Sequence, residues 1–379
     1  MFLNAIKLAT VSGFDIKVDP SWALIAALVT WTLSQQYFPA TLPEQTSQMY
    51  VVMAVVAMLS FFGSLLLHEL AHSVVARRFG VQIKGITLFL FGGVAELAEE
   101  PKSATAEFWI ALAGPAMSLS LSAVFWLLAQ LSVQLLNAPA VIETLSYLAA
   151  VNLVIALFNL VPAFPLDGGR VLRAYLWHRH GDILRATKAA ARSGTIFAYG
   201  LMFLGVLVLF QGLLITGLWY IMIGFFVMGA ARGAYHSQIM DNAFAGKTVG
   251  NLMVQNPIVV SSEMTLSDFV NTVVLSKRVS FVPVVEDGIL LGQIDKDVLS
   301  VIDHDNWSNT RVGDVFAGLD VASTVPPDMP ISGLLAQIAQ TGTRKFLVVK
   351  DHTLLGVITL ANLIGYMHTV ENMRRVQYL

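Results

Sequence analysis

The chain has 379 residues and a formal net charge of −2, and it is 56% hydrophobic but only 13% charged. Soluble domains carry about 25% charged residues, so this composition excludes a protein that is an ordinary soluble domain throughout. The near-neutral charge and the lack of a basic tail give no reason to expect nucleic acid as a partner. The sequence contains no cysteine, which excludes disulfides, a cysteine nucleophile and cysteine-ligated zinc, so a metal would be held by histidines and carboxylates.

The charged residues are sparse up to about residue 240 and reach an ordinary density beyond it. Residues 1–20 lack the charged, apolar and cleavage regions of a signal peptide, so we expect no removable signal. A helix needs about 20 apolar residues to cross the bilayer core, and six segments approach or exceed this length. They are residues 21–38, 48–77, 106–135, 141–161, 194–213 and 215–234.

The basic residues between these segments predict an orientation. Lysine or arginine lies before the first segment, in the loops after the second and fourth segments, and at the end of the sixth segment. The loops after the first, third and fifth segments contain neither residue. Under the positive-inside rule, this pattern places both termini in the cytoplasm. We therefore expect a multi-pass protein of the cell membrane, surrounded by lipid. Five or seven spans would break the alternation of charge.

Residues 81–96, "VQIKGITLFLFGGVAE", do not fit a span, because they are short, rich in β-branched side chains and contain a Gly-Gly pair. They predict a small sheet or hairpin at membrane depth. Non-helical backbone is tolerated there only when it is buried in protein or lines a cavity. Whether this hairpin pairs with another chain or only seals the helix bundle stays open.

From about residue 245 the sequence contains two similar units with an offset of 63 to 64 residues. Val249-Gly250 matches Val312-Gly313, and Gly292 matches Gly356. Each unit has the pattern strand, helix, two strands, helix. A repeat of this length suits a tandem pair of small domains rather than a solenoid, and the pair resembles tandem CBS domains. We expect a membrane domain over residues 1–240 and two CBS domains over 245–305 and 308–370.

His68, Glu69 and His72 form the pattern H-E-x-x-H inside the second apolar segment. The two histidines are four residues apart, so they share one helix face and can bind one zinc ion, with Glu69 beside it as general base. A charge at the centre of a span costs about 2.5–3.5 kcal/mol, so ionisable residues there usually mark a functional site. The competing interpretation is structural, with His68 capping a polar patch, Glu69 paired with arginine and His72 facing headgroups.

A third ligand is expected in "NLVPAFPLDGGR", residues 159–170. Its prolines and paired glycines break the helix after the fourth segment, so Asp167 lies on irregular backbone that can turn back into the bundle. Three protein ligands leave zinc a fourth position for water, which would attack a peptide carbonyl after Glu69 removes its proton. Asn159 could donate a hydrogen bond to the substrate or the oxyanion. The alternatives are a simple helix-ending turn for Asp167 and a helix–helix amide contact for Asn159.

Taken together, H-E-L-A-H in a second span, "FGG" in a hairpin, "AGP" at residues 113–115 and "NLVPAFPLDGG" resemble the site-2 protease family of intramembrane metalloproteases. Members with six spans and a C-terminal CBS pair form a subgroup that this chain resembles throughout. The resemblance implies one zinc ion per chain held by His68, His72 and Asp167, with Glu69 as the catalytic base. It also implies that Asn159 and Pro165 shape the cleft, and that the strand with Gly92 and Gly93 lies near the incoming substrate.

The resemblance further implies that the substrates are single-span membrane proteins, such as anti-sigma factors or membrane-tethered regulators already trimmed by another protease. A helical substrate has all its backbone hydrogen bonds satisfied internally, so its carbonyls are not available to a nucleophile until it unwinds. Pairing with a sheet edge offers the unwound backbone new partners. The hairpin predicted at residues 81–96 is the candidate edge.

Tandem CBS domains usually bind an adenosine nucleotide, and their ribose contact has the pattern G-h-h-[ST]-x-x-[DN]. The second unit fits it with Gly356, Thr359 and Asn362, whereas the first unit has Asp295 where a hydroxyl residue is expected. We therefore expect at most one competent pocket, for ATP or AMP, which would modulate access of substrate to the protease. The alternative is a tail that binds no ligand and serves in docking or in a homodimer.

The sequence thus predicts a polytopic α-helical membrane protein with a small β-hairpin and a C-terminal α/β CBS pair. Its predicted activity is that of a zinc metalloendopeptidase. A metal or ion transporter gated by CBS domains is the alternative from another class. Transport needs exchangeable ligands along a path, and the other spans offer almost no carboxylates or histidines. A catalytically inactive docking protein is disfavoured by the complete set of His68, Glu69, His72 and Asp167.

Overall fold

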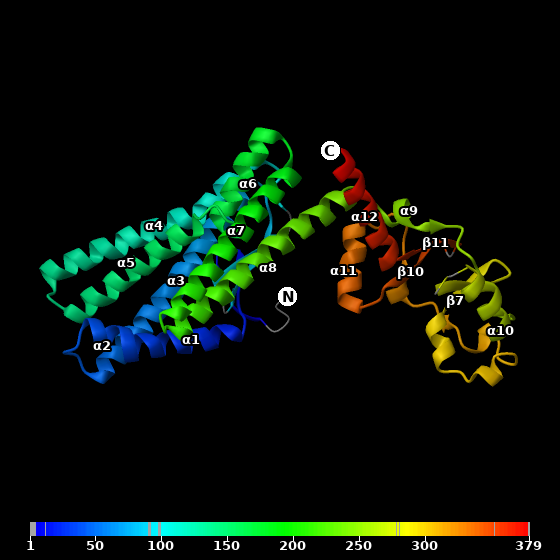
Figure 1. Ribbon diagram of the computed structural model, residues 1–379, viewed down its shortest axis with the longest axis horizontal. Helices are drawn as coiled ribbons and strands as arrows, with labels where there is room; N and C mark the ends of the chain where they lie inside the picture. The colour runs from blue at the N-terminus through cyan, green and yellow to red at the C-terminus, as the bar shows by residue number, and fades with distance from the viewer. Residues whose placement is uncertain are drawn as a thin grey trace. The chain divides into compact units, whose positions relative to one another are not determined.

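The computed structural model describes residues 5–11, 13–89, 92–97, 100–277, 279, 281–351 and 353–377. The chain divides into two compact units, Met1–His236 and Ser237–Leu379. The first unit is mostly helical, and the second contains short helices and two sheets (Figure 1).

Among the described residues, five helices are long and apolar enough to cross a membrane. They coincide with the second to sixth segments expected from the sequence, which confirms a membrane-embedded helical fold. A shorter helix, α6 (Asp167–His180), lies between the third and fourth of them. The five helices are α3 (Ser47–Arg78), α4 (Ala104–Leu135), α5 (Pro139–Asn159), α7 (Ile183–Phe210) and α8 (Leu214–Phe244).

The first expected span is divided into three consecutive helical pieces. They are α1 (Ser21–Thr32), the π-helix η1 (Leu33–Tyr37) and α2 (Phe38–Thr41). Leu33 and Phe38 pack against Tyr50 and Met53 of α3. Because α1 alone is only 12 residues long, shorter than the roughly 20 residues that cross a bilayer, the count of six spans stays a prediction.

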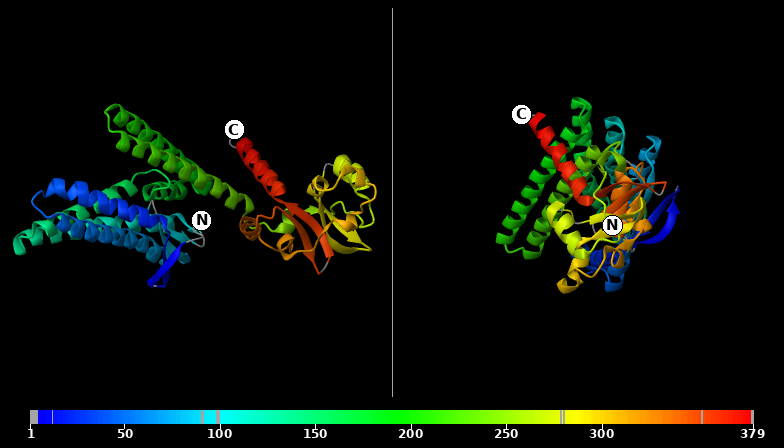
Figure 2. Two further views of the ribbon diagram at one scale, coloured as in Figure 1. Left: turned by 90° about the horizontal axis from the view of Figure 1, so that it is seen from below. Right: turned by 90° about the vertical axis from the view of Figure 1, so that its right-hand side faces the viewer.

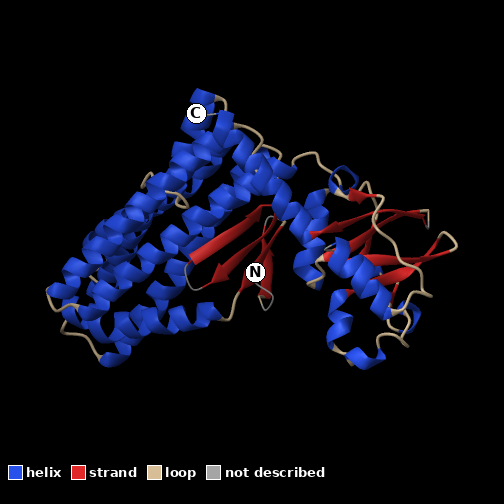
Figure 3. Ribbon diagram, turned by 45° about the vertical axis from the view of Figure 1, so that its right-hand side comes forward, coloured by secondary structure: helices blue, strands red, loops and turns tan. Residues whose placement is uncertain are grey.

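A four-stranded sheet accompanies these helices, and Figure 3 shows its strands beside them. The expected hairpin is present as β3 (Ile83–Phe89) and β4 (Gly92–Leu97). Two N-terminal strands, β1 (Ile6–Val11) and β2 (Phe14–Val18), extend it in the order β1-β2-β3-β4, with β2 and β3 parallel. The sheet is therefore larger than the sequence predicted, and β4 forms one of its edges. Phe91 of the expected "FGGV" strand lies outside the described residues.

Helices α7 and α8 form an antiparallel pair, seen from two directions in Figures 1 and 2. Glycines permit their close approach, as is common between helices in membranes. A Cβ atom on Gly205 would lie 2.7 Å from the carbonyl oxygen of Gly217, and one on Gly224 would lie 2.9 Å from the carbonyl oxygen of Ala198. Any larger residue at these positions would push the two helices apart.

The second unit is built from two related hairpins. Strands β6 (Phe281–Glu286) and β7 (Ile289–Asp295) form one, and β10 (Lys345–Lys350) and β11 (Thr353–Thr359) form the other. Gly292 and Gly356 hold equivalent places, as the sequence repeat predicts: they pair with Val284 and Val348, and each pair directly precedes a β-bulge. The sheets have the orders β6-β7-β8 and β5-β11-β10-β9, with β5 (Val254–Gln255), β8 (Ala317–Gly318) and β9 (Thr324–Val325) at their edges.

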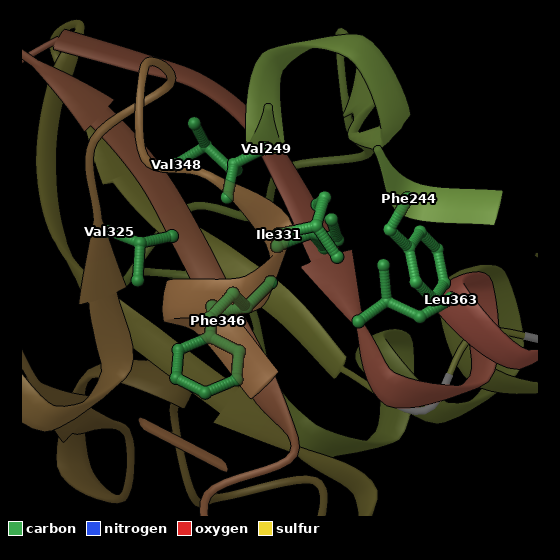
Figure 4. Close-up of a cluster of buried hydrophobic side chains, with 9 residues drawn as sticks. Phe244, Val249, Val325, Ile331, Phe346, Val348 and Leu363 are labelled. Atoms are coloured by element: carbon green, nitrogen blue, oxygen red, sulfur yellow. The ribbon is translucent and has the colours of Figure 1, made fainter. Parts of the chain in front are cut away.

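Short helices cover these sheets and enclose one hydrophobic core over each, and a further buried cluster, formed by Phe281, Leu290, Leu347 and Val357, lies between the two hairpins. One core contains Val260, Phe269 and Ile294, and the other contains Phe244 and Leu363, which face each other in Figure 4. The helices are α9 (Val249–Leu252), α10 (Leu266–Asp268), α11 (Ile331–Thr341) and α12 (Leu360–Gln377), the π-helix η2 (Phe269–Leu275), and the 3₁₀ turns η3 (Lys296–Ser300), η4 (His304–Asn306), η5 (Val312–Asp314) and η6 (Val321–Ser323).

Candidate metal centre

Three of the predicted site residues meet inside the first unit. His68 and His72 lie on one face of α3, Asp167 is the first residue of α6, and all three are buried. The Nε2 atoms of His68 and His72 are 3.2 Å apart, and each lies 3.2 Å from Oδ2 of Asp167. Among the described residues this is the group of histidines and carboxylates whose spacing suits a metal ion.

Glycines bring Asp167 to the histidines. The loop after α5 folds under the first turn of α6, where a Cβ on Gly168 would collide with the carbonyl of Leu160 and one on Gly169 with the backbone nitrogen of Phe164. Gly194 of α7 touches the carbonyl of Phe164 from the other side. The "DGG" pair therefore allows a tight reversal of the chain. Pro165, predicted to shape the cleft, lies in this loop two residues before Asp167.

Helix α4 orients both histidines. Nδ1 of His68 lies 2.9 Å from Oγ of Ser118, and Nδ1 of His72 donates to the carbonyl of Ile110 at 2.6 Å. Gly114 lies midway between Ile110 and Ser118 on the same helix face, and a Cβ there would collide with Nε2 of both histidines. The "AGP" motif contains Gly114, but no motif in the sequence pointed to Ile110 or Ser118. Each lies four residues from Gly114, on the same helix face, and this spacing is the signal that could have found them.

The donor set fits a cation. A carbonyl only accepts hydrogen bonds, so the Nδ1 atom of His72 carries a proton, and neutral His72 presents a lone pair at Nε2. When the ring is neutral, that lone pair faces a carboxylate oxygen of Asp167 at 3.2 Å, and these two acceptors repel each other unless a positive charge, a proton on the ring or a metal ion, lies beside them. Ligand atoms at about 2.0–2.1 Å from a tetrahedral zinc ion are roughly 3.3 Å apart. The three observed separations of 3.2 Å match this spacing.

The charge of Asp167 is also suited to a metal. Burial by itself raises the pKa of this carboxyl, but His72, His68 and Arg170 outweigh the burial and hold its pKa well below the usual range. Nη1 of Arg170, one turn further along α6, lies 3.9 Å from the second carboxylate oxygen. Asp167 is therefore an anion that presents one oxygen to the histidines and the other to a guanidinium group.

A buried ion pair fastens α6 to α4. Arg173 donates from Nε to Oε1 of Glu107 at 2.6 Å, and Glu107 is completely buried. The guanidinium of Arg173 also lies 5.2 Å from the centre of the Phe164 ring, in the loop that precedes Asp167. Removing one partner of a buried pair typically costs 3–5 kcal/mol, so this contact strongly holds α6 in place. No motif in the sequence predicted this pair.

The edge strand of the sheet passes beside Glu69. A Cβ atom on Gly93 would lie 2.6 Å from Cγ of Glu69, so only glycine allows β4 to approach this closely. Gly92 pairs with Phe89 at the start of the same strand. Glu69 itself is partly exposed, between the two buried histidines in sequence. The "GG" strand thus lies beside the H-E-x-x-H helix, whereas the roles predicted for these residues stay predictions.

Asn159 is the last residue of α5 and is half-buried. A helix–helix amide contact does exist on α5, but Asn152, two turns earlier, makes it. Asn152 is completely buried, and its Nδ2 atom donates to Oγ of Ser64 on α3 at 3.2 Å. The role of Asn159 in substrate binding therefore stays a prediction.

The two CBS-like units differ at their predicted nucleotide positions. In the second, Oδ1 of Asn362 accepts hydrogen bonds from the backbone and the hydroxyl of Thr359, at 2.9 and 2.6 Å. Gly356 lies against the carbonyl of Val254, 2.6 Å from where a Cβ would be. In the first CBS-like unit, Asp295 occupies the position that matches Thr359. It forms an ion pair with Lys345 of the second CBS-like unit. The equivalent positions thus have different partners.

Comparisons with known proteins identify the family. Residues 56–140 and 134–203 match Peptidase family M50, and residues 249–304 and 314–369 each match the CBS domain. Zinc metalloprotease Rip3 of Mycobacterium tuberculosis is 39% identical over 359 residues, which are 94% of this chain and 91% of that protein. This chain belongs to the M50 family of site-2 proteases. It is accordingly a membrane-embedded zinc metalloprotease with a tandem CBS pair, as the sequence motifs predicted.

Other known proteins are also similar to this M50 protease. A zinc metalloprotease of Synechocystis is 30% identical over 97% of this chain and 96% of its own length, and one of Methanocaldococcus jannaschii is 32% identical over 82% and 84%. The solved site-2 protease from Methanocaldococcus jannaschii aligns with 61% of this chain and 95% of its own, with 28% identity and a TM-score of 0.41. The CBS domain of a bacterial CNNM/CorC Mg²⁺ transporter in complex with ATP aligns with 35% of this chain, with 20% identity and a TM-score of 0.31.

Proposed function

We propose that this M50 protease is an intramembrane endopeptidase that cleaves single-span membrane proteins in or near their transmembrane segment. Anti-sigma factors and membrane-tethered regulators are the substrates that we expect. The observation that supports the proposal best is the convergence of His68, His72 and Asp167 inside a membrane helix bundle, next to an edge strand. The alternative, a CBS-gated transporter, is disfavoured by membership of a protease family.

We assign one zinc ion per chain to His68, His72 and Asp167, and the role of general base to Glu69. When bound, zinc would polarise the scissile carbonyl and make water a nucleophile at neutral pH. Glu69 then takes a proton from the attacking water and returns it to the amide nitrogen that leaves, so that no proton is lost in the cycle. Ser118 and the carbonyl of Ile110 keep the histidine rings in orientation while this occurs.

The substrate would enter along β4. A transmembrane helix must unwind before its carbonyls become accessible, and the unwound backbone needs hydrogen-bond partners at membrane depth. No other described strand pairs with the outer side of β4, so this edge can offer its backbone groups. Gly93 lets the strand lie against Glu69, and we propose that Gly92, Asn159 and Pro165 line the cleft with it.

The CBS pair is proposed to regulate this activity. We expect residues 1–240 to form the protease domain, and 245–305 and 308–370 to form the CBS domains, with both termini in the cytoplasm of the cell. An adenine nucleotide, ATP or AMP, would contact Gly356, Thr359 and Asn362. It can regulate cleavage only by binding more tightly to one arrangement of the tail and the membrane domain than to another. A homodimer formed through the tails is the further assembly that we expect.

The test presents one cleavable sequence in two contexts. The full-length protein is reconstituted in vesicles with a single-span substrate, and separately with the same segment as a soluble, unstructured peptide. Glu69→Gln serves as the inactive control in both. We expect cleavage of the membrane-inserted substrate by the wild type and none by the control. Cleavage of the soluble peptide with equal or higher efficiency would contradict an intramembrane substrate while leaving the metalloprotease chemistry intact.

A further inference from the structure

A basic pocket lies between α7 and α8, away from the metal centre in sequence. Its volume is about 300 Å³, and among its lining residues are Lys188, Arg192 and Thr195 of α7 and Arg232, Tyr235 and His236 of α8. The α7 residues follow helical spacing and so share a face, as do the three α8 residues. Both faces extend the interface along which α7 and α8 pack, where Gly224 lies against Ala198. The packing of α7 against α8 therefore also forms the pocket.

The position of the pocket along the two helices coincides with a membrane boundary. Residues 193–231, which contain the apolar parts of α7 and α8, include no charged side chain. Arg192 and Arg232 are the first charges that follow at the two ends of this stretch. Because the helices are antiparallel, these two arginines face each other at one depth, where hydrocarbon gives way to the headgroup region.

The pocket is strongly cationic. The sequence has no aspartate or glutamate between Ile183 and His236. Asp182, just before α7, is already engaged, since it accepts from the backbone nitrogen of Leu184 at 2.8 Å and pairs with Arg185. In the part of the chain that the structure describes, no carboxylate forms an ion pair with Lys188, Arg192 or Arg232.

A phosphate group at membrane depth matches this site. Arginine and lysine bind phosphate oxygens, and basic pockets between membrane helices bind anionic headgroups. Ala191 and the methyl group of Thr195 add apolar surface on which a glycerol backbone can rest. We propose that the α7–α8 pocket binds the phosphate of an anionic phospholipid headgroup, and so forms a lipid site separate from the metal centre.

The experiment measures lipid retention by the delipidated full-length protein, using native mass spectrometry with phosphatidylglycerol and, separately, phosphatidylcholine. The variant Arg192→Gln/Arg232→Gln removes two pocket cations. Its control, Arg179→Gln/Arg185→Gln, removes the same charge from nearby positions outside the pocket. Each basic side chain near a membrane surface contributes about fivefold in affinity, so we expect the pocket variant to bind phosphatidylglycerol at least tenfold more weakly. The control and the wild type should bind alike.

A second variant tests whether loss of lipid binding comes from the pocket itself rather than from the change in net charge. Thr195→Trp keeps every charge but fills the pocket, and we expect it to lose phosphatidylglycerol as the charge variant does. Equal weakening in the pocket and control variants would overturn the proposal, because the arginines would then act only as diffuse charge that orients the helices. Displacement of the lipid by equimolar inorganic phosphate would overturn it as well, by identifying a site for free phosphate. Zinc content should be unchanged in all variants.

Discussion

The metal centre and the CBS tail treat polar side chains in opposite ways. In the membrane unit, polar groups from α3, α4 and α6 converge in a buried site, and their partners come from residues 38 to 99 positions away in sequence. In the tail, the polar side chains predicted to bind nucleotide, Thr359 and Asn362, are partly exposed, and Asn362 accepts its hydrogen bonds from Thr359 three residues away. The polar groups of the metal centre are thus buried at a cost in free energy, whereas the hydroxyl and amide at the predicted nucleotide positions are not.

The largest contrast is expected between two ion pairs, one in each unit. Glu107→Gln removes the buried carboxylate of the Glu107–Arg173 pair, so that Arg173 keeps only the longer 3.8 Å contact with the exposed carboxylate of Glu100 among its described ion pairs. The substitution should lower the free energy of unfolding of the membrane unit by about 3–5 kcal/mol. Glu263→Gln removes the partner of Arg311 in an exposed pair of the tail, and should have no measurable effect. Chemical unfolding of the purified full-length protein measures both. Equal losses in the two variants would show that burial does not distinguish the pairs.

A smaller but more local effect is expected at two glycines. A methyl group on Gly114 would occupy the space beside Nε2 of both histidines, so Gly114→Ala should displace them and reduce cleavage by about 100-fold, together with loss of zinc. Gly63→Ala, in α3, is the matched control, because a Cβ at that position meets no neighbouring atom. If the two variants retain the same activity and zinc content, the close packing of α4 against the two histidines is not needed for zinc binding or cleavage.

The smallest effect concerns the orientation of one ligand. Ser118→Ala removes the hydroxyl beside Nδ1 of His68 and should weaken zinc binding by about tenfold, within the range found for such supporting contacts. Competition with a chelator measures the affinity, and Ser118→Thr, which retains the hydroxyl, should restore most of it. Ser120→Ala in α4 is the control, since among the described residues that exposed hydroxyl donates to the carbonyl of Ala116 in its own helix. An unchanged affinity in Ser118→Ala would remove Ser118 from the site.

Local patterns in the sequence predicted much of this arrangement. Apolar length predicted the helices, the spacing of His68 and His72 predicted a shared face, and the helix breakers before Asp167 predicted a chain reversal. The offset between the two tail units predicted their matching hairpins. Each of these features depends on residues close together in the chain, or on a repeat, and so can be read without knowing the fold.

The contacts that the sequence did not predict are all long-range. Strands β1 and β2 precede the first helix, and their place in the sheet depends on pairing with β3, which follows α3. Ser118, Ile110 and Gly114 are unremarkable residues in an apolar helix until α3 packs against them. The pair of Glu107 and Arg173 joins helices whose packing no local pattern specifies. For Asn159, Pro165 and the nucleotide positions, the predictions await experiment.

The most direct test of the metal centre combines zinc content with cleavage. Full-length wild type, His72→Ala and Glu69→Gln are purified, zinc is measured per chain, and cleavage of a membrane-inserted substrate is followed. We predict about one zinc per chain in the wild type and Glu69→Gln, almost none in His72→Ala, and cleavage by the wild type alone, because loss of a general base typically costs about 100-fold to 10,000-fold in rate. Stoichiometric zinc in His72→Ala, or wild-type cleavage by Glu69→Gln, would contradict the assignment.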